Sequence, residues 1–210
     1  MTTASLLPSF INAIEETINA SADEVAKLDQ AIGDGDHVVN LQRGLNAIAT
    51  ISDELAAENW SVALMKVGMT LMSTMGGASG SLFGTLFISM AKAAKDRDIE
   101  FSSFAEIFYP GVEAVKQRGK ADLGEKTMLD TLIPVANSLQ SSVNDDIAYT
   151  EALDRVKTAA ITGMESTKDM LATKGRASFL GERAIGHIDA GARTSQLMVC
   201  AIADYLLINN

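Results

Sequence analysis

The apolar residues of this chain recur at helical spacing almost from end to end. Before the first glycine, Ile11, Ile14, Ile18, Val25 and Leu28 form one stripe, which predicts a single helix of about five turns. No stretch shows the alternation and β-branched enrichment that are typical of strands. Apolar residues make up 47% of the 210 positions, enough to bury a sizeable core. The sequence therefore predicts an all-α fold, organised as a single domain over residues 1–210.

The same periodicity predicts seven further helices, with bends expected at Pro110 and Pro134 and an interruption expected near Gly163. The second of these predicted helices is apolar almost all round, which indicates deep burial. Their predicted ranges are 40–51, 62–73, 82–94, 104–117, 125–139, 148–171 and 193–208. About eight helices in all are expected.

Charge and cysteine content exclude several classes of protein. The net charge is −10, no basic stripe is present and aromatic residues are only 5%, so nucleic acid is not an expected partner. Cys200 is alone and permits no intramolecular disulfide, which is typical of a reducing compartment. The start of the chain does not resemble a signal peptide, and no apolar run reaches the roughly 18 residues of a membrane span. We expect a cytoplasmic protein without a membrane span.

Three carboxylates gather around two glycines in residues 28–37, which read LDQAIGDGDH. Carboxylates are the protein ligands that Mg²⁺ prefers, and Gly33 and Gly35 let the backbone turn so that Asp29, Asp34 and Asp36 can converge. The spacing does not fit a calcium-binding EF-hand loop. Composition alone equally allows a flexible acidic loop with local side-chain turns.

Glycine-rich loops recur at alternate helix junctions, at residues 33–35, 76–80, 119–124 and 175–191. In an up-and-down bundle, alternate loops lie at the same end. The sequence therefore predicts a binding site at one rim. An ordered binding lid is expected at residues 174–191, since long structureless loops are uncommon in compact domains.

Each remaining motif has a ligand-binding and a structural interpretation. The GGASG segment at residues 76–80 precedes a predicted helix and either cradles an anion or makes a tight turn. The RGKA segment at 118–121 lacks the glycine and hydroxyl residue of a P-loop. His37 is expected to contact phosphate or ribose, with a hydrogen-bonded structural role as the alternative. Lys126 is expected to be solvated, and the methionines to fill the core, with Met75 near enough to a glycine loop to touch a base.

Five motifs taken in order resemble the nucleotide-binding L subunits of the dihydroxyacetone kinases. They read LDxxIGDGDH, GGASG, RGKA, GEKTMLD and KGRASFLGERxIGHxDxGA, and the resemblance spans essentially the whole chain. It implies a closed barrel of about eight antiparallel amphipathic helices with ADP or ATP at one rim. It also implies two Mg²⁺ ions on Asp29, Asp34 and Asp36, with Arg176 stabilising the transferred phosphate. The positions it implies for nucleotide contact are His37, Val38, Val39, Asn40, Ala78, Ser79, Gly119, Met128, Arg176, Asp189, Ala190 and Gly191.

The resemblance also implies partners. In this family the phosphoryl group passes to dihydroxyacetone held on a histidine of a K subunit, and this chain contains no K domain. A free-standing L chain resembles the phosphotransferase-dependent kind, in which a phosphohistidine-carrying M subunit rephosphorylates the bound ADP. Separate L subunits of ATP-dependent ketose or tetrose kinases remain an alternative. Ser81 and Ala190 depart from the usual motifs, which have Gly-Pro and Asp-Pro-Gly there.

Two other classes of function stay open from the sequence. A nucleotide-gated regulatory protein would use the same site while contacting a transcription regulator. A lipid-carrying or purely structural helical bundle would show no Mg-dependent affinity for nucleotides.

Overall fold

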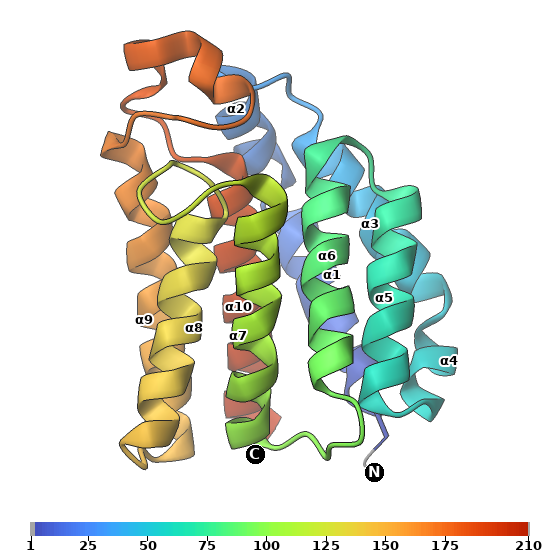
Figure 1. The fold of residues 1–210 in the computed structure, drawn as a ribbon. Coiled ribbons are helices and arrows are strands. Elements are labelled where there is room, and N and C mark those ends of the chain that lie inside the picture. Colours follow the sequence, from blue (N-terminus) through green and yellow to red (C-terminus); the bar gives the residue numbers. More distant parts are fainter. Residues whose placement is uncertain (1–2, 210) are drawn as a thin grey trace.

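The fold of this chain, in a computed structural model that describes residues 3–209, is built from helices alone (Figure 1). Within that part of the chain, the only β-type pairing is an isolated bridge between Thr3 and Asn59. The α-helices are α1 (Leu7–Ala20), α2 (Ala22–Ile32), α3 (His37–Thr50), α4 (Ser52–Ala57), α5 (Trp60–Thr74), α6 (Gly77–Ala93), α7 (Phe101–Gly119), α8 (Leu129–Asn144), α9 (Tyr149–Ser166) and α10 (Ala190–Asn209). Two 3₁₀ helices, η1 (Thr167–Asp169) and η2 (Arg176–Ala184), complete the described elements. The all-α prediction is confirmed.

The long helices pack side by side, each against its neighbour. Contacts run from α1 to α3, then through α5, α6, α7, α8 and α9 to α10, which packs back against α1 (Figure 1). One continuous apolar core lies between them, with side chains such as Leu41, Ile107 and Leu129 almost completely buried. Burying each of these side chains stabilises the fold by about 1.5–3 kcal/mol relative to exposure. Both termini lie at the end of the bundle opposite to η2 (Figure 1).

The first apolar stripe forms two helices, and the prediction of one helix of about five turns is wrong. The chain leaves the helical conformation at Ser21, with φ −102° and ψ 6°, between α1 and α2. Ile18 and Val25 on either side of this break are both fully buried. The stripe therefore stays in contact with the core on both sides of the break. Serine is a weaker helix former than alanine, which favours the break here.

Residues 125–128 lie outside α8, and the predicted helical start at residue 125 is wrong. The Asp130 carboxylate accepts hydrogen bonds from the backbone N–H groups of Gly124 at 2.5 Å and Thr127 at 2.7 Å. These bonds hold the preceding residues in a loop, in which Lys126 has a positive φ of 60°. Satisfying backbone donors through a side chain is a common alternative to continuing a helix.

Gly163 does not interrupt α9, contrary to the sequence prediction, and the helix continues to Ser166. A Cβ atom at this position would lie 2.1 Å from the backbone oxygen of Asp130 in α8. Glycine is needed here because the two helix backbones approach closely, as in other tight helix pairs.

The methionines of α5 are divided between the core and the surface. Met75, just beyond the helix, is buried, whereas Met69 is 60% exposed and Met72 is 44% exposed. The predicted deep burial of this helix on all sides is therefore wrong, although its inner face joins the core. The short helix α4, which the sequence analysis did not predict, packs against α1, α3 and α5.

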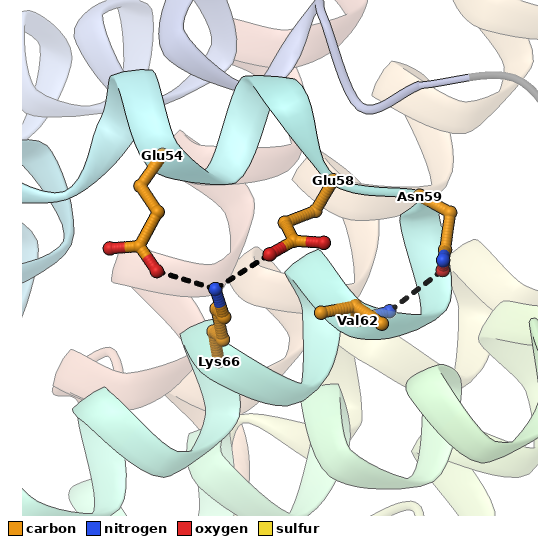
Figure 2. A network of polar contacts seen from close by, with 5 residues as sticks. All are labelled: Glu54, Glu58, Asn59, Val62 and Lys66. Atoms are coloured by element: carbon orange, nitrogen blue, oxygen red, sulfur yellow. Dashed lines mark hydrogen bonds and ion pairs between the residues drawn. The ribbon is translucent and has the colours of Figure 1, made fainter.

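A polar network fixes the corner between α4 and α5 (Figure 2). The Lys66 ammonium group binds the carboxylates of Glu54 at 2.5 Å and Glu58 at 2.8 Å. The Asn59 side chain accepts the Val62 N–H at 3.0 Å and so caps the first turn of α5. Exposed ion pairs contribute little to stability, so the cap and the packing define this corner. In the part of the chain that the structure describes, no helix is both long and apolar enough to cross a bilayer.

Candidate functional site

The glycine-rich loops surround a cavity of about 750 Å³ at one end of the bundle. Its walls come from the acidic loop after α2, the start of α6, the end of α7, the loop before α8, and the segments on either side of η2. The loops at residues 33–36, 75–77 and 120–128 reach this end together with η2 (Figure 1). The prediction that the glycine-rich loops meet at one rim is confirmed.

The acidic loop brings three carboxylates together. Asp29, Asp34 and Asp36 each offer an oxygen, and these oxygens lie within 4.8 Å of one another. A Cβ on Gly33 would lie only 2.2 Å from a carboxylate oxygen of Asp29, and Gly35 has a positive φ of 78°. Both glycines are therefore required by the conformation that makes the cluster. Convergent carboxylate oxygens are suited to a hard divalent cation such as Mg²⁺.

Arg176 approaches the acidic cluster from the first turn of η2. Its guanidinium Nε lies 2.8 Å from Oδ2 of Asp34, and its side chain is 70% exposed. The Arg176 guanidinium group thus already forms an ion pair with the cluster, which shows that the three carboxylates favour a positively charged partner. Because Arg176 sits at the mouth of the cavity, the same guanidinium can reach an anionic ligand beside the cluster.

His37 is held in a hydrogen-bond network at the start of α3. Its backbone N–H donates to Asp29 at 3.0 Å, while its ring nitrogens lie 3.1 Å from Ser79 Oγ and 2.9 Å from Thr194 Oγ1. Burial lowers the pKa of His37, against the opposing effect of Asp29, Asp36 and Asp34. A neutral imidazole with both nitrogens engaged matches the structural interpretation, and it joins α3, α6 and α10 beneath the cavity. Contact with phosphate or ribose stays a prediction.

The glycine-rich segment at residues 76–80 makes a tight turn and begins α6, whose N-cap residue makes no side-chain hydrogen bond. A Cβ on Gly80 would lie 2.2 Å from the Met75 backbone oxygen, so the turn itself demands glycine. Ala78 and Ser79 nevertheless line the cavity, at the first turn of a 17-residue helix. Free N–H groups and the helix dipole favour an anion at such a position. The two interpretations of this motif are therefore compatible.

Asp189 lies immediately before α10 and lines the cavity. Its carboxylate accepts the Ala192 N–H at 2.8 Å, which caps the helix, and its own N–H donates to Thr167 Oγ1 at 3.1 Å. Burial raises the pKa of Asp189 to about 6, although the bond from Ala192 and the charge of Lys126 oppose this shift. This carboxylate is therefore held by local structure and loses a proton near neutral pH.

Lys126 is buried, and the prediction that it is solvated is wrong. Its side chain is only 1% exposed, and its ammonium group donates to the backbone carbonyls of Thr167 and His187. Those acceptors replace the water that a buried ammonium group loses. Lysines usually lie at the surface because they are charged, so residue type alone does not predict this burial. The one sequence signal for it was the place of Lys126 inside a motif that contributes other residues to the cavity wall.

Most of the residues implied for nucleotide contact meet in this cavity. Val38 is instead buried in the core and Val39 is 54% exposed, so neither lines the cavity and their contact with a nucleotide stays a prediction. Within the segment at residues 174–191, η2 covers Arg176–Ala184, and Ala177 and Ala184 pack near Ile32. Residues that the sequence analysis did not single out for the site also line it, among them Ile32, Leu82, Val115 and Leu129. The residues that line the cavity as implied are His37, Asn40, Ala78, Ser79, Gly119, Met128, Arg176, Asp189, Ala190 and Gly191.

The model of one protein family, described as the DAK2 domain, matches residues 31–204, which include every loop around the cavity. The chain belongs to the DAK2 domain family. This DAK2 domain is 40% identical over 194 residues to the ADP-binding subunit DhaL of PEP-dependent dihydroxyacetone kinase 1 from Listeria innocua, with 92% of each chain covered. It is 38% identical over 189 residues to the corresponding DhaL subunit from Escherichia coli, with 90% of each chain covered.

Solved structures share the fold of this DAK2 domain. The dihydroxyacetone kinase of C. freundii in complex with AMP-PNP and Mg²⁺ superimposes with a TM-score of 0.77 at 23% sequence identity. The match covers 97% of this chain and 34% of that one. The all-helical arrangement is therefore the fold of the family, within a longer protein in that case.

Proposed function

We propose that this DAK2 domain is the ADP-binding subunit of a PEP-dependent dihydroxyacetone kinase. In this proposal it carries a phosphoryl group on a Mg-bound nucleotide and transfers it to dihydroxyacetone held on a partner K subunit. The observation that carries the proposal is the cluster of Asp29, Asp34 and Asp36 in a rim cavity that Arg176 also lines. Similarity along nearly the whole length of the curated DhaL subunits supports the same assignment.

The chemistry of the donors supports a metal-bound polyphosphate. In the proposed complex, Asp29, Asp34 and Asp36 hold two Mg²⁺ ions, which when bound neutralise charge on the transferring phosphoryl group. Arg176 adds a guanidinium group to that charge neutralisation. Such alignment and charge neutralisation supply most of what phosphoryl transfer needs.

The shape and lining of the cavity support ADP or ATP as the ligand. Its volume of about 750 Å³ lies within the usual range of small-molecule pockets, which is roughly 300–1,000 Å³. The carboxylates, Arg176 and the start of α6 gather the groups suited to phosphates and their metal ions. Met128, Ala190 and Gly191 offer an uncharged wall suited to the nucleoside. The proposed nucleotide contacts also include His37, Val38, Val39, Asn40, Ala78, Ser79, Gly119 and Asp189.

The acid–base chemistry is assigned to the partner. Both ring nitrogens of His37 are engaged by Ser79 and Thr194, which leaves this imidazole poorly placed to accept a proton from a sugar. We infer that the K subunit supplies substrate and base, and that a phosphohistidine-carrying M subunit of the phosphotransferase system rephosphorylates the bound ADP. A transcription regulator is a further partner that the same exposed rim would suit.

We infer that α1, α3 and α5–α10 close an eight-helix barrel, since each packs against the next and α10 packs against α1. Residues 1–210 then form one domain. We place the protein in the cytoplasm, where phosphoryl donors of this kind are available.

Substituting Asp34→Ala tests the proposed metal site. We expect the variant to lose Mg-dependent ADP binding in calorimetry, because one of three converging ligands is gone, while helix content by circular dichroism stays unchanged. Asp154→Ala on the outer face of α9 is the matched control and should bind as the unmodified chain does. Wild-type ADP affinity in Asp34→Ala would overturn the assignment.

The phosphate donor is tested separately by gel filtration of the purified chain. ADP that stays bound through the column supports rephosphorylation in place. ADP that exchanges freely with ATP supports the alternative, an ATP-dependent kinase subunit for dihydroxyacetone or another ketose or tetrose. A chain with no Mg-dependent affinity for either nucleotide would instead be a structural or lipid-carrying bundle.

A further inference from the structure

Lys126 is a buried cation that the proposed phosphoryl transfer does not use. Its side chain is only 1% exposed, and its backbone has a φ of 60°, a left-handed conformation that side-chain-bearing residues rarely adopt. A strained backbone and a buried ammonium group each cost stability. The position therefore requires a compensating contact that an ordinary surface lysine does not make.

That contact joins three separate segments of the chain. The ammonium group donates to the Thr167 carbonyl at 2.5 Å, in η1, and to the His187 carbonyl, just before α10. Burial lowers the pKa of Lys126, and the carboxylates of Asp189, Asp169 and Asp130 oppose that shift. One side chain thus ties the loop before α8 to the end of α9 and to the start of α10.

Lys126 and its acceptor His187 are each followed, within a few residues, by residues of the cavity wall. Met128, two residues after Lys126, lines the cavity, as do Asp189, Ala190 and Gly191 shortly after His187. Thr167 is shared, because its carbonyl accepts from Lys126 while its hydroxyl accepts the N–H of Asp189. The bond from Thr131 Oγ1 to the Ala192 carbonyl, at 3.0 Å, also joins α8 to α10, but it lies beyond the cavity-lining segment. The spacing between Met128 and residues 189–191 therefore depends in part on the Lys126 ammonium group and the Thr167 hydroxyl group.

We propose that Lys126 is a positioning residue that sets the spacing between Met128 and the 189–191 segment, and thereby the affinity for the nucleoside part of the nucleotide. The inference rests on the proposed function. Lys126 itself lines the cavity, but both described bonds of its ammonium group go to backbone carbonyls, so the proposal assigns it a positioning role and no contact with the phosphates. An ammonium group can serve both carbonyls at once, whereas a thioether of similar length leaves them without a donor.

The test compares Lys126→Met with Lys168→Met, a matched loss of charge at an exposed position in η1. Calorimetry with Mg-ADP should show at least a tenfold loss of affinity for Lys126→Met and less than a twofold change for Lys168→Met. Mg-pyrophosphate, which contains no nucleoside, should bind Lys126→Met within twofold of the unmodified chain. Equal Mg-ADP affinity, or an equal loss for ADP and pyrophosphate, would overturn the proposal.

If Lys126→Met does not fold, Thr167→Val tests the same spacing between Met128 and residues 189–191. This nearly isosteric change removes the hydroxyl that accepts the Asp189 N–H, and it should weaken Mg-ADP about threefold or more while leaving Mg-pyrophosphate unchanged. An unchanged ADP affinity in Thr167→Val would contradict the proposal. Failure of the unmodified chain to bind Mg-ADP would instead reject the proposed function, so the two failures are distinguishable.

Discussion

Asp189 makes folding stability depend on pH. Burial raises its pKa from 3.8 to about 6, so the folded protein binds a proton that the unfolded chain releases. Its contribution to stability is therefore fully present below about pH 4 and is lost as the pH rises through about 6. Asn at this position keeps the helix cap without titrating.

Substituting Asp189→Asn should therefore stabilise the nucleotide-free protein progressively between pH 4 and pH 7. We expect the difference in free energy of unfolding between variant and unmodified chain to grow in favour of the variant by an amount of the order of 2 kcal/mol over this range. Urea unfolding at several pH values, with EDTA present, measures it. A constant or opposite difference would show that Asp189 is not held in a proton-retaining environment.

Single residues differ in how far the sequence predicts them. Asp29, Asp34 and Asp36 are predictable because the glycines between them are required by the turn that brings them together. Lys126 is not, because its burial depends on the carbonyls of two segments more than 40 residues away along the chain. Local patterns carry no signal for such distant acceptors.

The packing of α8 against α9 depends on one glycine. A Cβ at Gly163 would lie 2.1 Å from the backbone oxygen of Asp130, the residue whose carboxylate organises the loop before α8. Backbone atoms cannot move aside as a flexible side chain can. The distance between these two helices is therefore set at Gly163.

Substituting Gly163→Ala should destabilise the protein by about 1–3 kcal/mol through overpacking. The intrinsic helix propensity of alanine favours the variant by about 1 kcal/mol, so a loss of stability identifies packing as the dominant effect. Thermal unfolding measures the change, and Thr162→Ala at the exposed neighbouring position is the control. An equal or higher melting temperature for Gly163→Ala would contradict the close approach of the two helices.

Helices are more predictable here than the places where they begin and end. The apolar stripes locate every long helix, because each stripe must face the same core. The apolar stripes do not predict the break at Ser21 or the start of α8 at Leu129 instead of residue 125. The start of α8 depends on hydrogen bonds outside the stripe, those from Gly124 and Thr127 to Asp130. The break at Ser21 leaves no mark in the stripe, because Ile18 and Val25 on either side of it both face the core. Short α4 has too few apolar residues to show a period.

The whole molecule places its glycine-rich loops at one end and both termini at the other (Figure 1). Alternate helix junctions in an up-and-down bundle share an end, so the position of the cavity is predictable from the order of motifs alone. The exact lining is not, because residues such as Leu82 and Val115 enter the cavity through helix packing. The exposed rim, with Arg176 at its mouth, leaves the site open to a partner.

In the proposed function, this chain passes phosphoryl groups from a phosphohistidine protein to dihydroxyacetone on a K subunit. The direct measurement is formation of dihydroxyacetone phosphate in a mixture of the chain, Mg²⁺, K subunit, dihydroxyacetone and phosphorylated M subunit, with ADP only in an amount equal to the chain. We predict product in excess of the ADP supplied, and none when either partner is left out. Absence of product, while the Escherichia coli DhaL subunit supports the reaction in the same mixture, would contradict the account.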